Sequence, residues 1–308
     1  MYLQETKEKL VILLYHGVSE YENRGICNLQ GKHISYELFS SQMKFIKKNC
    51  NPVSINDWIE IKNDHSSIPP NPVIISFDDG FENNYTTACP ILDKFNIPAV
   101  FYISSGMIGT NKMFWVDVLE NLIEECKKPS IVVKLDKPKK FYLNNNLLKF
   151  QALKEIKSWC KLAKNDEKER LINELRSVTN VNPNQDSNPN YSLLNWKQVS
   201  AINDNSLFTI GGHSLNHNIL SSLDEEDMKF EIEESLRLIY KNLGKKTIHY
   251  SYPEGQQAHF NNEVISFLKE NGIVCCPTAI EGYNTYDEDL FNLRRVMVGF
   301  EKISFPYL

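Results

Sequence analysis

The sequence lacks several features that would assign a protein to a class at once. None of its apolar runs approaches the roughly 20 residues that a membrane-spanning helix needs, so we expect no transmembrane segment. Basic residues are not in excess, because 34 Lys and Arg against 39 Asp and Glu give a net charge of −5, which excludes a general nucleic-acid or anionic-membrane binder. The seven cysteines are odd in number and include no Cys-x-x-Cys pair, so neither a disulfide framework nor a structural zinc site is expected.

The N-terminal residues do not have the pattern of a secretion signal. Met1–Lys9 carries mixed charge, and the apolar run that follows, Leu10–Leu14, has five residues, too few for the core of a signal peptide. The scattered cysteines indicate a reducing compartment. Together these features predict a soluble cytoplasmic protein, and nothing in the pattern indicates an oligomeric state.

Short apolar runs rich in Val, Ile, Phe and Tyr recur along the chain and are bounded by turn residues. Such runs are typical of strands that are covered on both faces. Helical patterns lie between several of them, for example over residues 39–46 and 228–239, and this alternation predicts an α/β fold with a largely parallel sheet. A barrel and an open doubly wound sheet suit the pattern about equally. The candidate strands are Leu10–Leu14, Pro72–Phe77, Pro98–Ile103, Leu207–Ile210, Ile248–Tyr252, Ile273–Cys276 and Arg295–Phe300.

The alternation of strands and helices breaks between residues 108 and 195. This stretch has charged helical patterns and a candidate strand pair at Ile131–Leu135 and Lys140–Leu143. Residues 124–170 contain 13 Lys and Arg against 7 Asp and Glu, a local charge of 13 − 7 = +6 in a protein of −5. We therefore expect a single domain over residues 1–308 with a mostly helical insertion at 108–195. The insertion is either a solvated cap or a basic lid that meets an anionic part of a substrate.

Four groups of polar residues directly follow apolar runs. Because the carboxyl ends of parallel strands meet at one edge of an α/β sheet, where active sites form, we expect these groups to lie together. The groups are Tyr15-His16-Gly17, Asp78-Asp79-Gly80, the segment from Gly211 to His217, and Pro253-Glu254-Gly255.

Asp78 and Asp79 are adjacent carboxylates at the end of a candidate strand. Such a pair repels unless a cation or hydrogen bonds relieve it. Successive side chains of a strand point in opposite directions, so the two residues are expected to have different roles. The alternative is a turn in which one Asp caps a helix, since Asp-Gly is a frequent turn dipeptide.

Three histidines are candidates for the same edge of the sheet. His213 and His217 have i, i+4 spacing, which brings the two rings together on a helix, and a loop can do the same. With one carboxylate they form a His₂Asp set that suits Zn²⁺ and leaves positions open, whereas alone they read equally well as surface or capping residues. His16 is either a satisfied core histidine or a general acid/base.

At these residues the sequence resembles the polysaccharide deacetylase family, which is carbohydrate esterase family 4 or the NodB-homology fold. Ser76-Phe77-Asp78-Asp79-Gly80 matches the family's Thr/Ser-Phe-Asp-Asp-Gly motif, and the segment from His213 to His217 matches its His-Ser/Thr-x-x-His motif. Tyr252-Pro253-Glu254-Gly255 is similar to a third motif, often Tyr-Pro-Tyr-Gly. The opening Leu14–Val18 and the closing Leu293–Val296 are similar to a branch whose members begin with Tyr-His.

The resemblance implies a distorted (β/α)7 barrel-like fold and a divalent metal, usually Zn²⁺, with Co²⁺, Ni²⁺ or Fe²⁺ as alternatives. Carried over position by position, Asp79, His213 and His217 are the metal ligands and Asp78 is the general base. The motif Tyr252, Pro253, Glu254 and Gly255 then meets the substrate, and a backbone N–H near Glu254 holds the oxyanion.

The sequence departs from the family pattern in three places. The third motif often begins with an Arg that orients the base, but Ser251 stands here, so we predict that Arg294 or Arg295 replaces it from another strand. The usual late Leu-x-His is absent, and the Tyr-His branch implies that His16 is the general acid. Finally, Glu254 replaces the common aromatic residue and adds charge at the rim of the site.

We therefore expect a metal-dependent hydrolase that removes an N-acetyl or other acyl group from an amino sugar. A cytoplasmic enzyme of this kind acts on a soluble, nucleotide-linked or lipid-linked sugar during surface polysaccharide or glycan synthesis, and no nucleic-acid partner is expected. Two alternatives stay open. One is a catalytically inactive, sugar-binding member of the fold, and the other is a metallo-amidase or deformylase on a different acyl amide.

Overall fold

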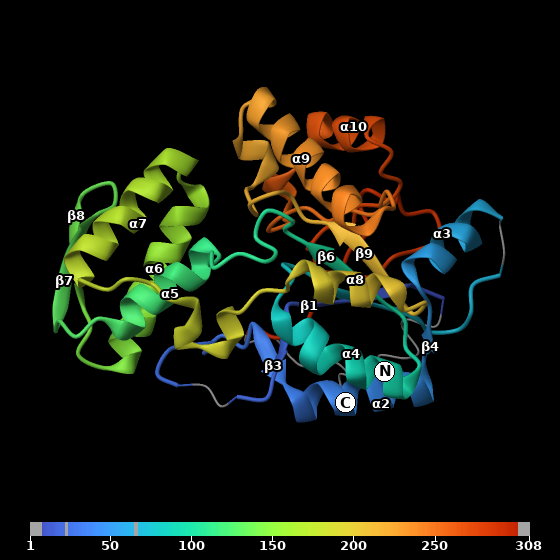
Figure 1. Ribbon diagram of the computed structural model, residues 1–308, viewed down its shortest axis with the longest axis horizontal. Helices are drawn as coiled ribbons and strands as arrows, with labels where there is room; N and C mark the ends of the chain where they lie inside the picture. The colour runs from blue at the N-terminus through green and yellow to red at the C-terminus, as the bar shows by residue number, and fades with distance from the viewer. Residues whose placement is uncertain (1–7, 22–23, 65–66, 301–308) are drawn as a thin grey trace. The chain divides into compact units, whose positions relative to one another are not determined.

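The computed structural model describes residues 8–21, 24–64 and 67–300, which form two compact units. The first, here called the sheet unit, draws on Met1–Glu20, Gln30–Thr110 and Leu193–Leu308. The second, the helical unit, draws on Tyr21–Leu29 and Asn111–Ser192. Figure 1 labels the elements of both units. The role of residues 108–195 as a cap or lid within one catalytic domain stays a prediction.

A parallel sheet is the centre of the sheet unit. Its strands follow the order β10-β1-β5-β6-β9, with β4 also paired to β5, and every pair is parallel. The order shows crossovers between strands that are far apart in sequence, as the predicted α/β fold requires. The strands are β1 (Val11–Tyr15), β4 (Asn51–Pro52), β5 (Pro72–Phe77), β6 (Ala99–Ile103), β9 (Phe208–Gly212) and β10 (Val296–Met297).

Beyond β9 the sheet continues through less regular chain. Two of the expected strands, Ile248–Tyr252 and Ile273–Cys276, are present only as single parallel bridges, Gly212 to Tyr250 and His249 to Cys275. Backbone hydrogen bonds from Thr278 to Leu293 and from Arg295 to Ile280 then lead toward β10, next to β1. The chain of hydrogen-bonded segments thus leads from β9 back to β10 and β1 at the other end of the sheet, which agrees with the predicted barrel-like α/β fold. The expected strand Arg295–Phe300 is shortened to β10.

Alternation along the strands divides the buried side chains between two layers. On β1, Val11, Leu13 and Tyr15 belong to the largest hydrophobic cluster, whereas Ile12 belongs to another. Successive strand side chains point to opposite faces, so a run that is apolar at every position must be covered on both sides. The prediction of fully buried strands is thus confirmed for β1, β5 and β6, in which every residue is buried.

Helices supply the cover for the sheet, and side chains cap the first turns of all those given below except α4. Ser35 accepts a hydrogen bond from the backbone of Leu38, and Ser54 forms a capping box with Asp57. On the first helix, Phe39, Met43 and Ile46 are buried, as their spacing predicts. The helices of this unit are α2 (Tyr36–Asn49), α3 (Ile55–Asn63), α4 (Cys89–Phe95), α8 (Trp196–Asp204), α9 (Glu225–Leu243) and α10 (Asn262–Glu270).

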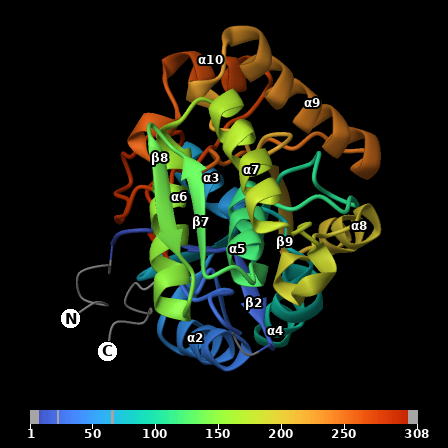
Figure 2. The same ribbon diagram turned by 90° about the vertical axis from the view of Figure 1, so that its left-hand side faces the viewer.

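The helical unit has a hydrophobic core of its own. A hairpin of two antiparallel strands lies beside three helices (Figure 2). Buried side chains such as Leu122, Ile156 and Leu175 form the core between them. The long helical pattern after residue 146 divides into two helices because the backbone of Ala163 and Lys164 is extended. The elements are α5 (Trp115–Glu125), β7 (Ser130–Lys134), β8 (Pro138–Tyr142), α6 (Asn146–Leu162) and α7 (Asn165–Thr179).

Several short strands and turns were not expected from the sequence. They include a short parallel pair, β2 (Gly17–Ser19) with β3 (His33–Ser35), and a π-helical turn at Asn84–Ala88. All seven cysteines are buried and free, so the structure has no disulfide to counter the prediction of reduced thiols. No helix within residues 8–21, 24–64 or 67–300 has the length and apolar character needed to cross a bilayer.

Candidate active site and metal centre

The predicted site residues lie at one edge of the sheet, where parallel strands end side by side. Tyr15 and Phe77, the last residues of β1 and β5, are paired, and the backbone N–H of Asp78 donates to the carbonyl of Tyr15 at 3.0 Å. Further along the same edge, the backbone N–H of His213, which follows β9, donates to the carbonyl of Ile103, the last residue of β6, at 3.0 Å. Residues that are far apart in sequence therefore enter the site from neighbouring strand ends.

Asp79, His213 and His217 converge on one point. One potential ligand atom from each lies within 4.8 Å of the other two, and all three residues are buried. The Oδ1 atom of Asp79 is 3.6 Å from Nε2 of His213 and 3.2 Å from Nε2 of His217. The two histidines approach through a loop rather than a helix, since the backbone after His213 has no helical assignment. Asp79 has a positive φ of 79°, which separates its carboxylate from that of Asp78.

The chemistry of this donor set fits a divalent cation. His213 Nδ1 donates to the carbonyl of Ser251 at 2.8 Å, which fixes the tautomer and turns the Nε2 lone pair toward Asp79. The Oδ1 of Asp79 is buried and no donor in the described residues makes a hydrogen bond to it. A buried carboxylate oxygen that faces an imidazole lone pair is unfavourable unless a cation lies between them. Two histidines and one carboxylate suit Zn²⁺ with open positions.

Burial and the neighbouring charges shift the pKa values of all three candidate ligands. Burial lowers the pKa of His213 to about 4, so its imidazole is neutral at pH 7. Burial opposes ionisation of Asp79, yet the neighbouring His217, His16 and His213 hold the pKa of this carboxyl below its usual range. Asp79 in turn raises the pKa of His217 against the effect of burial.

Asp78 has a different partner, as adjacent residues at a strand end should. The guanidinium of Arg295 donates from Nη1 to Oδ1 and from Nη2 to Oδ2 of Asp78, both at 2.7 Å. Arg295 is fully buried, and its Nε donates to the carbonyl of Thr278 at 2.6 Å. Although burial opposes ionisation, Arg295 holds the pKa of Asp78 below its usual value, so the side chain is a carboxylate at neutral pH.

The two candidate base-orienting arginines have separate environments. Arg295 contacts Asp78, whereas Arg294 is exposed and its guanidinium reaches the carbonyl of Glu281 at 3.5 Å. Ser251, at the position where the family motif often has Arg, joins the same network. Its Oγ lies 3.0 Å from His213 Nδ1, 3.2 Å from Arg295 and 3.3 Å from Asp78.

His16 follows β1 at the same edge and is partly exposed. Its Nδ1 is buried without a hydrogen-bond partner among the described residues, and its ring meets Phe300 edge-on at 5.1 Å. Burial lowers the pKa of His16; Asp79 and Asp78 oppose this effect, and Lys32 and Arg295 add to it. Its position suits proton transfer, while the role of general acid stays a prediction.

The third motif separates into a core part and a rim part. The ring of Tyr252 stacks on Phe260 at 4.2 Å within a hydrophobic cluster, so it packs in the core rather than lining the site. Glu254 is half-buried, has a positive φ of 59°, and its charge contributes to raising the pKa of His217. At Gly255 a Cβ would lie 2.6 Å from the backbone nitrogen of Ala279, so glycine is required for this close approach.

Three residues that sequence reasoning did not select also belong to the site. Ser251 forms the network described above, and the hydroxyl of Tyr250 accepts a hydrogen bond from the backbone N–H of Ser214 at 2.8 Å. Glu231 on α9 accepts hydrogen bonds from the loop that carries His217. A signal for Glu231 was present, because a carboxylate stands in the apolar stripe of this helix between Met228 and Ser235.

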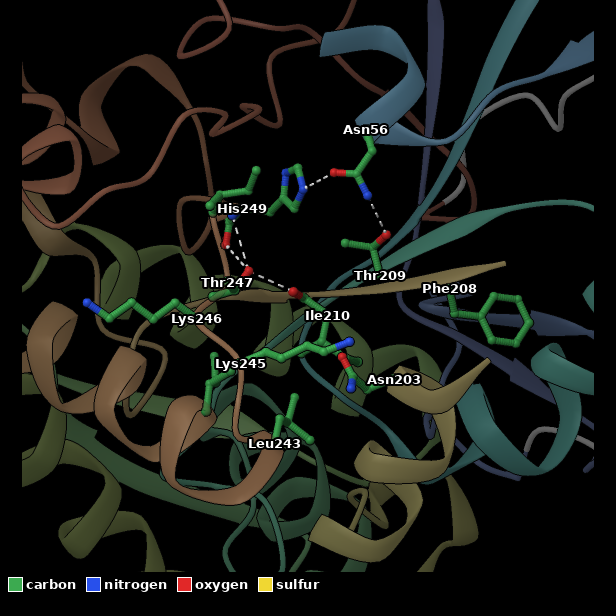
Figure 3. A pocket seen from close by; sticks show the side chains of 12 residues that line it. Asn56, Asn203, Phe208, Thr209, Ile210, Leu243, Lys245, Lys246, Thr247 and His249 are labelled. Carbon is green, nitrogen blue, oxygen red and sulfur yellow. Dashed lines mark hydrogen bonds between the residues drawn. The ribbon is translucent and has the colours of Figure 1, made fainter. Parts of the chain in front are cut away.

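A separate cavity of about 250 Å³ lies beside the start of β9, away from the strand ends that carry the site (Figure 3). His249 lies against it, and its Nε2 donates to Oδ1 of Asn56 at 2.8 Å, while Nδ2 of Asn56 reaches Thr209 (Figure 3). Burial lowers the pKa of His249 to about 4, so this imidazole is neutral at pH 7. None of the predicted site residues lines this cavity.

Comparison with curated and solved proteins gives consistent results. A stretch of 87 residues is 31% identical to a poly-β-1,6-N-acetyl-D-glucosamine N-deacetylase of Staphylococcus aureus, and it spans 28% of this chain and 30% of that protein. Similar solved structures include the Streptococcus pyogenes deacetylase PplD in complex with acetate (TM-score 0.60, 16% identity, covering 96% of this chain and 95% of that chain). Another is IcaB from Ammonifex degensii (TM-score 0.59, 16% identity, 94% and 92% covered).

A third structural neighbour, a de-N-acetylase from Aggregatibacter actinomycetemcomitans, has a TM-score of 0.60 at 19% identity and covers 96% of this chain and 97% of that chain. At such identities these likenesses establish the fold. The family model for polysaccharide deacetylases matches residues 65–138 and 151–276, which is more than half of the chain. The chain therefore belongs to the polysaccharide deacetylase family.

Proposed function

We propose that this protein is a metal-dependent N-deacetylase that hydrolyses the N-acetyl group of an amino sugar in a glycan. The observation that carries the proposal is the pairing of a His₂Asp cluster with a separate buried carboxylate, Asp78, that Arg295 holds ionised. A base and a cation site at one strand edge are the two components that metal-assisted hydrolysis of an amide needs. The relatives' names support an N-acetylated sugar as the substrate class.

In this proposal Asp79, His213 and His217 hold the cation, with Zn²⁺ as the first choice and Co²⁺, Ni²⁺ or Fe²⁺ as alternatives. The bound cation would polarise the amide carbonyl and make water a better nucleophile. Asp78 takes the proton of the attacking water, and the two hydrogen bonds from Arg295 keep this carboxylate ionised and aimed.

The remaining steps are assigned to residues at the rim. A backbone N–H near Glu254 stabilises the negative charge that develops on the carbonyl oxygen, in the bend that Glu254 and Gly255 form with positive φ. His16 protonates the departing amine. Because burial lowers its pKa, His16 is a strong acid once it carries a proton.

We further propose that the substrate is a nucleotide-linked or lipid-linked amino sugar used in cytoplasmic steps of surface polysaccharide or glycan synthesis. The seven free, buried thiols support a reducing compartment, and the basic segment 124–170 supports an anionic carrier. No nucleic-acid partner is proposed, because the net charge is −5. Fractionation of the native host cell, followed by immunodetection, tests the location.

The experiment that tests the function combines elemental analysis with acetate release from N-acetylhexosamine oligomers and UDP-linked N-acetylhexosamines. We expect about one metal per chain, and loss of both metal and acetate release in His213→Ala. Full activity in Asp79→Asn would refute the proposed ligand set. Glu233→Gln, an exposed carboxylate on α9, is the matched control and should behave as wild type.

Two other outcomes would favour the alternative functions. Bound metal without acetate release, but with release of formate or another acid from a different amide, favours a metallo-amidase or deformylase. Saturable sugar binding without bound metal or hydrolysis favours an inactive, sugar-binding member of the fold.

A further inference from the structure

The loop between the two histidine ligands has an unfavourable backbone conformation. Ser214 and His217 both have positive φ, 59° and 60°, a region that is strained for a residue other than glycine. Such a conformation persists only where surrounding groups hold it. Since His217 is itself one of these residues, whatever holds the loop also decides where its imidazole points.

A single buried carboxylate holds most of this loop. Glu231 on α9 is 4% exposed, and its Oε2 accepts from the backbone N–H groups of Leu215 and Asn216, both at 2.9 Å. Its Oε1 accepts from the side-chain amides of Asn216 at 2.8 Å and Asn218 at 2.9 Å. No basic side chain within the described residues forms an ion pair with Glu231, so the loop alone supplies the four donors that make burial of this charge tolerable.

The other side of the loop is held by neutral groups. The hydroxyl of Tyr250 accepts from the backbone N–H of Ser214 at 2.8 Å, and the N–H of Gly106 donates to the carbonyl of Leu215 at 2.8 Å. A Cβ at position 106 would lie 2.7 Å from that carbonyl oxygen, so the contact is as close as glycine permits. These contacts fix the beginning of the loop, while Glu231 is the group that binds its middle and reaches past His217 to Asn218.

We infer that Glu231 is a positioning residue for the metal centre, which sets the direction of the His217 imidazole toward Asp79 and His213. The inference rests on the proposed metal site. Without the carboxylate, the backbone N–H groups of Leu215 and Asn216 lose their acceptor and the strained loop relaxes. Outer partners that orient metal ligands commonly change metal affinity by about 10–100-fold when they are replaced.

The test compares Glu231→Gln with the control Glu233→Gln, an exposed carboxylate on the same helix. Glutamine keeps the size of glutamate but presents an NH₂ group where the two asparagine amides donate. We expect Zn²⁺ affinity, measured by competition with a chromogenic chelator, to weaken by about 10–100-fold in Glu231→Gln. The visible absorption bands of the Co²⁺-loaded protein should also change, because they report ligand geometry. The control should match wild type in both measurements.

Kinetics separate positioning from general destabilisation. The kinetics are measured at a temperature where circular dichroism shows both variants fully folded. Glu231→Gln should then lower kcat for acetate release, with KM within about twofold of wild type. The reason is that a misdirected cation weakens interactions with the transition state rather than with the ground state. An unchanged Zn²⁺ affinity and Co²⁺ spectrum in folded Glu231→Gln would overturn the inference while the proposed function stands. If the wild-type protein binds neither Zn²⁺ nor Co²⁺, the inference and the proposed function both fail.

Should Glu231→Gln fail to fold, Asn218→Ala takes its place, since it removes one donor to Oε1 and leaves the carboxylate. The inference then predicts a severalfold loss of Zn²⁺ affinity and a shifted Co²⁺ spectrum in Asn218→Ala. Wild-type values of both would overturn it.

Discussion

Replacing Arg295 with methionine removes the only charged partner that the described residues offer to the carboxylate of Asp78 at hydrogen-bonding distance. The native pair is bidentate, with both N–O distances at 2.7 Å, and the side chains of Arg295 and Asp78 are 0% and 5% exposed. Methionine fills much of the same volume without a charge or a donor. The change therefore isolates the electrostatic role of the guanidinium.

The magnitude follows from burial. Removing one partner of a buried, hydrogen-bonded ion pair typically costs about 3–5 kcal/mol, because the remaining charge stays buried without compensation. Ser251 is left as a weak partner, with its Oγ 3.3 Å from Asp78 Oδ2. The pKa of Asp78 in the folded protein lies below its pKa in the unfolded chain. The ionised carboxylate therefore contributes to stability at pH values above the unfolded pKa, and this contribution is lost as the pH falls through the folded pKa. Arg295→Met raises the folded pKa and removes this contribution at pH 7.

Urea unfolding at pH 7 with linear extrapolation measures the loss, which we expect to be about 3–5 kcal/mol for Arg295→Met. The double variant Arg295→Met with Asp78→Asn should recover part of it, because it no longer buries a lone charge. Arg294→Met, at the exposed neighbouring arginine, should stay within about 0.5 kcal/mol of wild type. A loss below about 1 kcal/mol in Arg295→Met, or a double variant less stable than the single one, would refute the reasoning.

Three further expectations concern other parts of the molecule. Burial holds the pKa of His249 near 4 against an ordinary value of 6.5, so on acidification the unfolded state binds the proton first. Lowering the pH from 7.5 to 4.5 should therefore reduce the free energy of unfolding by about 2–3 kcal/mol through this residue. Urea titrations of His249→Gln should show a correspondingly flatter pH dependence. Phe77→Ala should lose about 3–5 kcal/mol in the same assay, since the buried ring stacks between Tyr15 at 5.3 Å and Phe101 at 5.0 Å. Replacing the exposed Lys134 and Lys140 with glutamate should raise KM for a UDP-linked substrate more than for a neutral oligomer, if the basic segment meets an anionic carrier.

Each of these expectations has an outcome that would contradict it. A pH dependence of His249→Gln equal to that of wild type would mean that the imidazole titrates normally. A loss near 1 kcal/mol in Phe77→Ala would mean that the neighbouring rings collapse into the space. Equal changes of KM for charged and neutral substrates would remove the argument for an anionic carrier.

The strands and much of the helical cover were predictable because their physics is local. A run such as Leu10–Leu14 is apolar at every position, and alternation then sends Leu13 and Ile12 to two different buried clusters. The same reasoning failed where pairing is short. Nothing in the sequence indicated that Ile248–Tyr252 would form only isolated bridges, because that depends on the path of the neighbouring chain.

The candidate site was predictable only in part. Strand ends and the His-x-x-x-His spacing indicated two histidines with one carboxylate, and the family resemblance implied that Asp79 is that carboxylate. The structure brings the ligand atoms of Asp79, His213 and His217 within 4.8 Å of one another. Arg294 and Arg295 are adjacent and chemically identical, so sequence could not choose between them. The alternation of the backbone at this point exposes Arg294 and directs Arg295 to Asp78.

The sequence by itself determined the local features of the molecule: buried parallel strands, capped helices, a basic segment, and the residue types of the proposed metal centre. Those features depend on hydrophobicity, periodicity and short-range spacing, all of which are properties of neighbouring residues. Only the tertiary structure decided that Ser251 contacts Asp78 and that Glu231 binds the strained loop before His217. These contacts join residues up to 173 positions apart, and their formation requires the folded sheet, because only folding brings such distant groups within hydrogen-bonding distance.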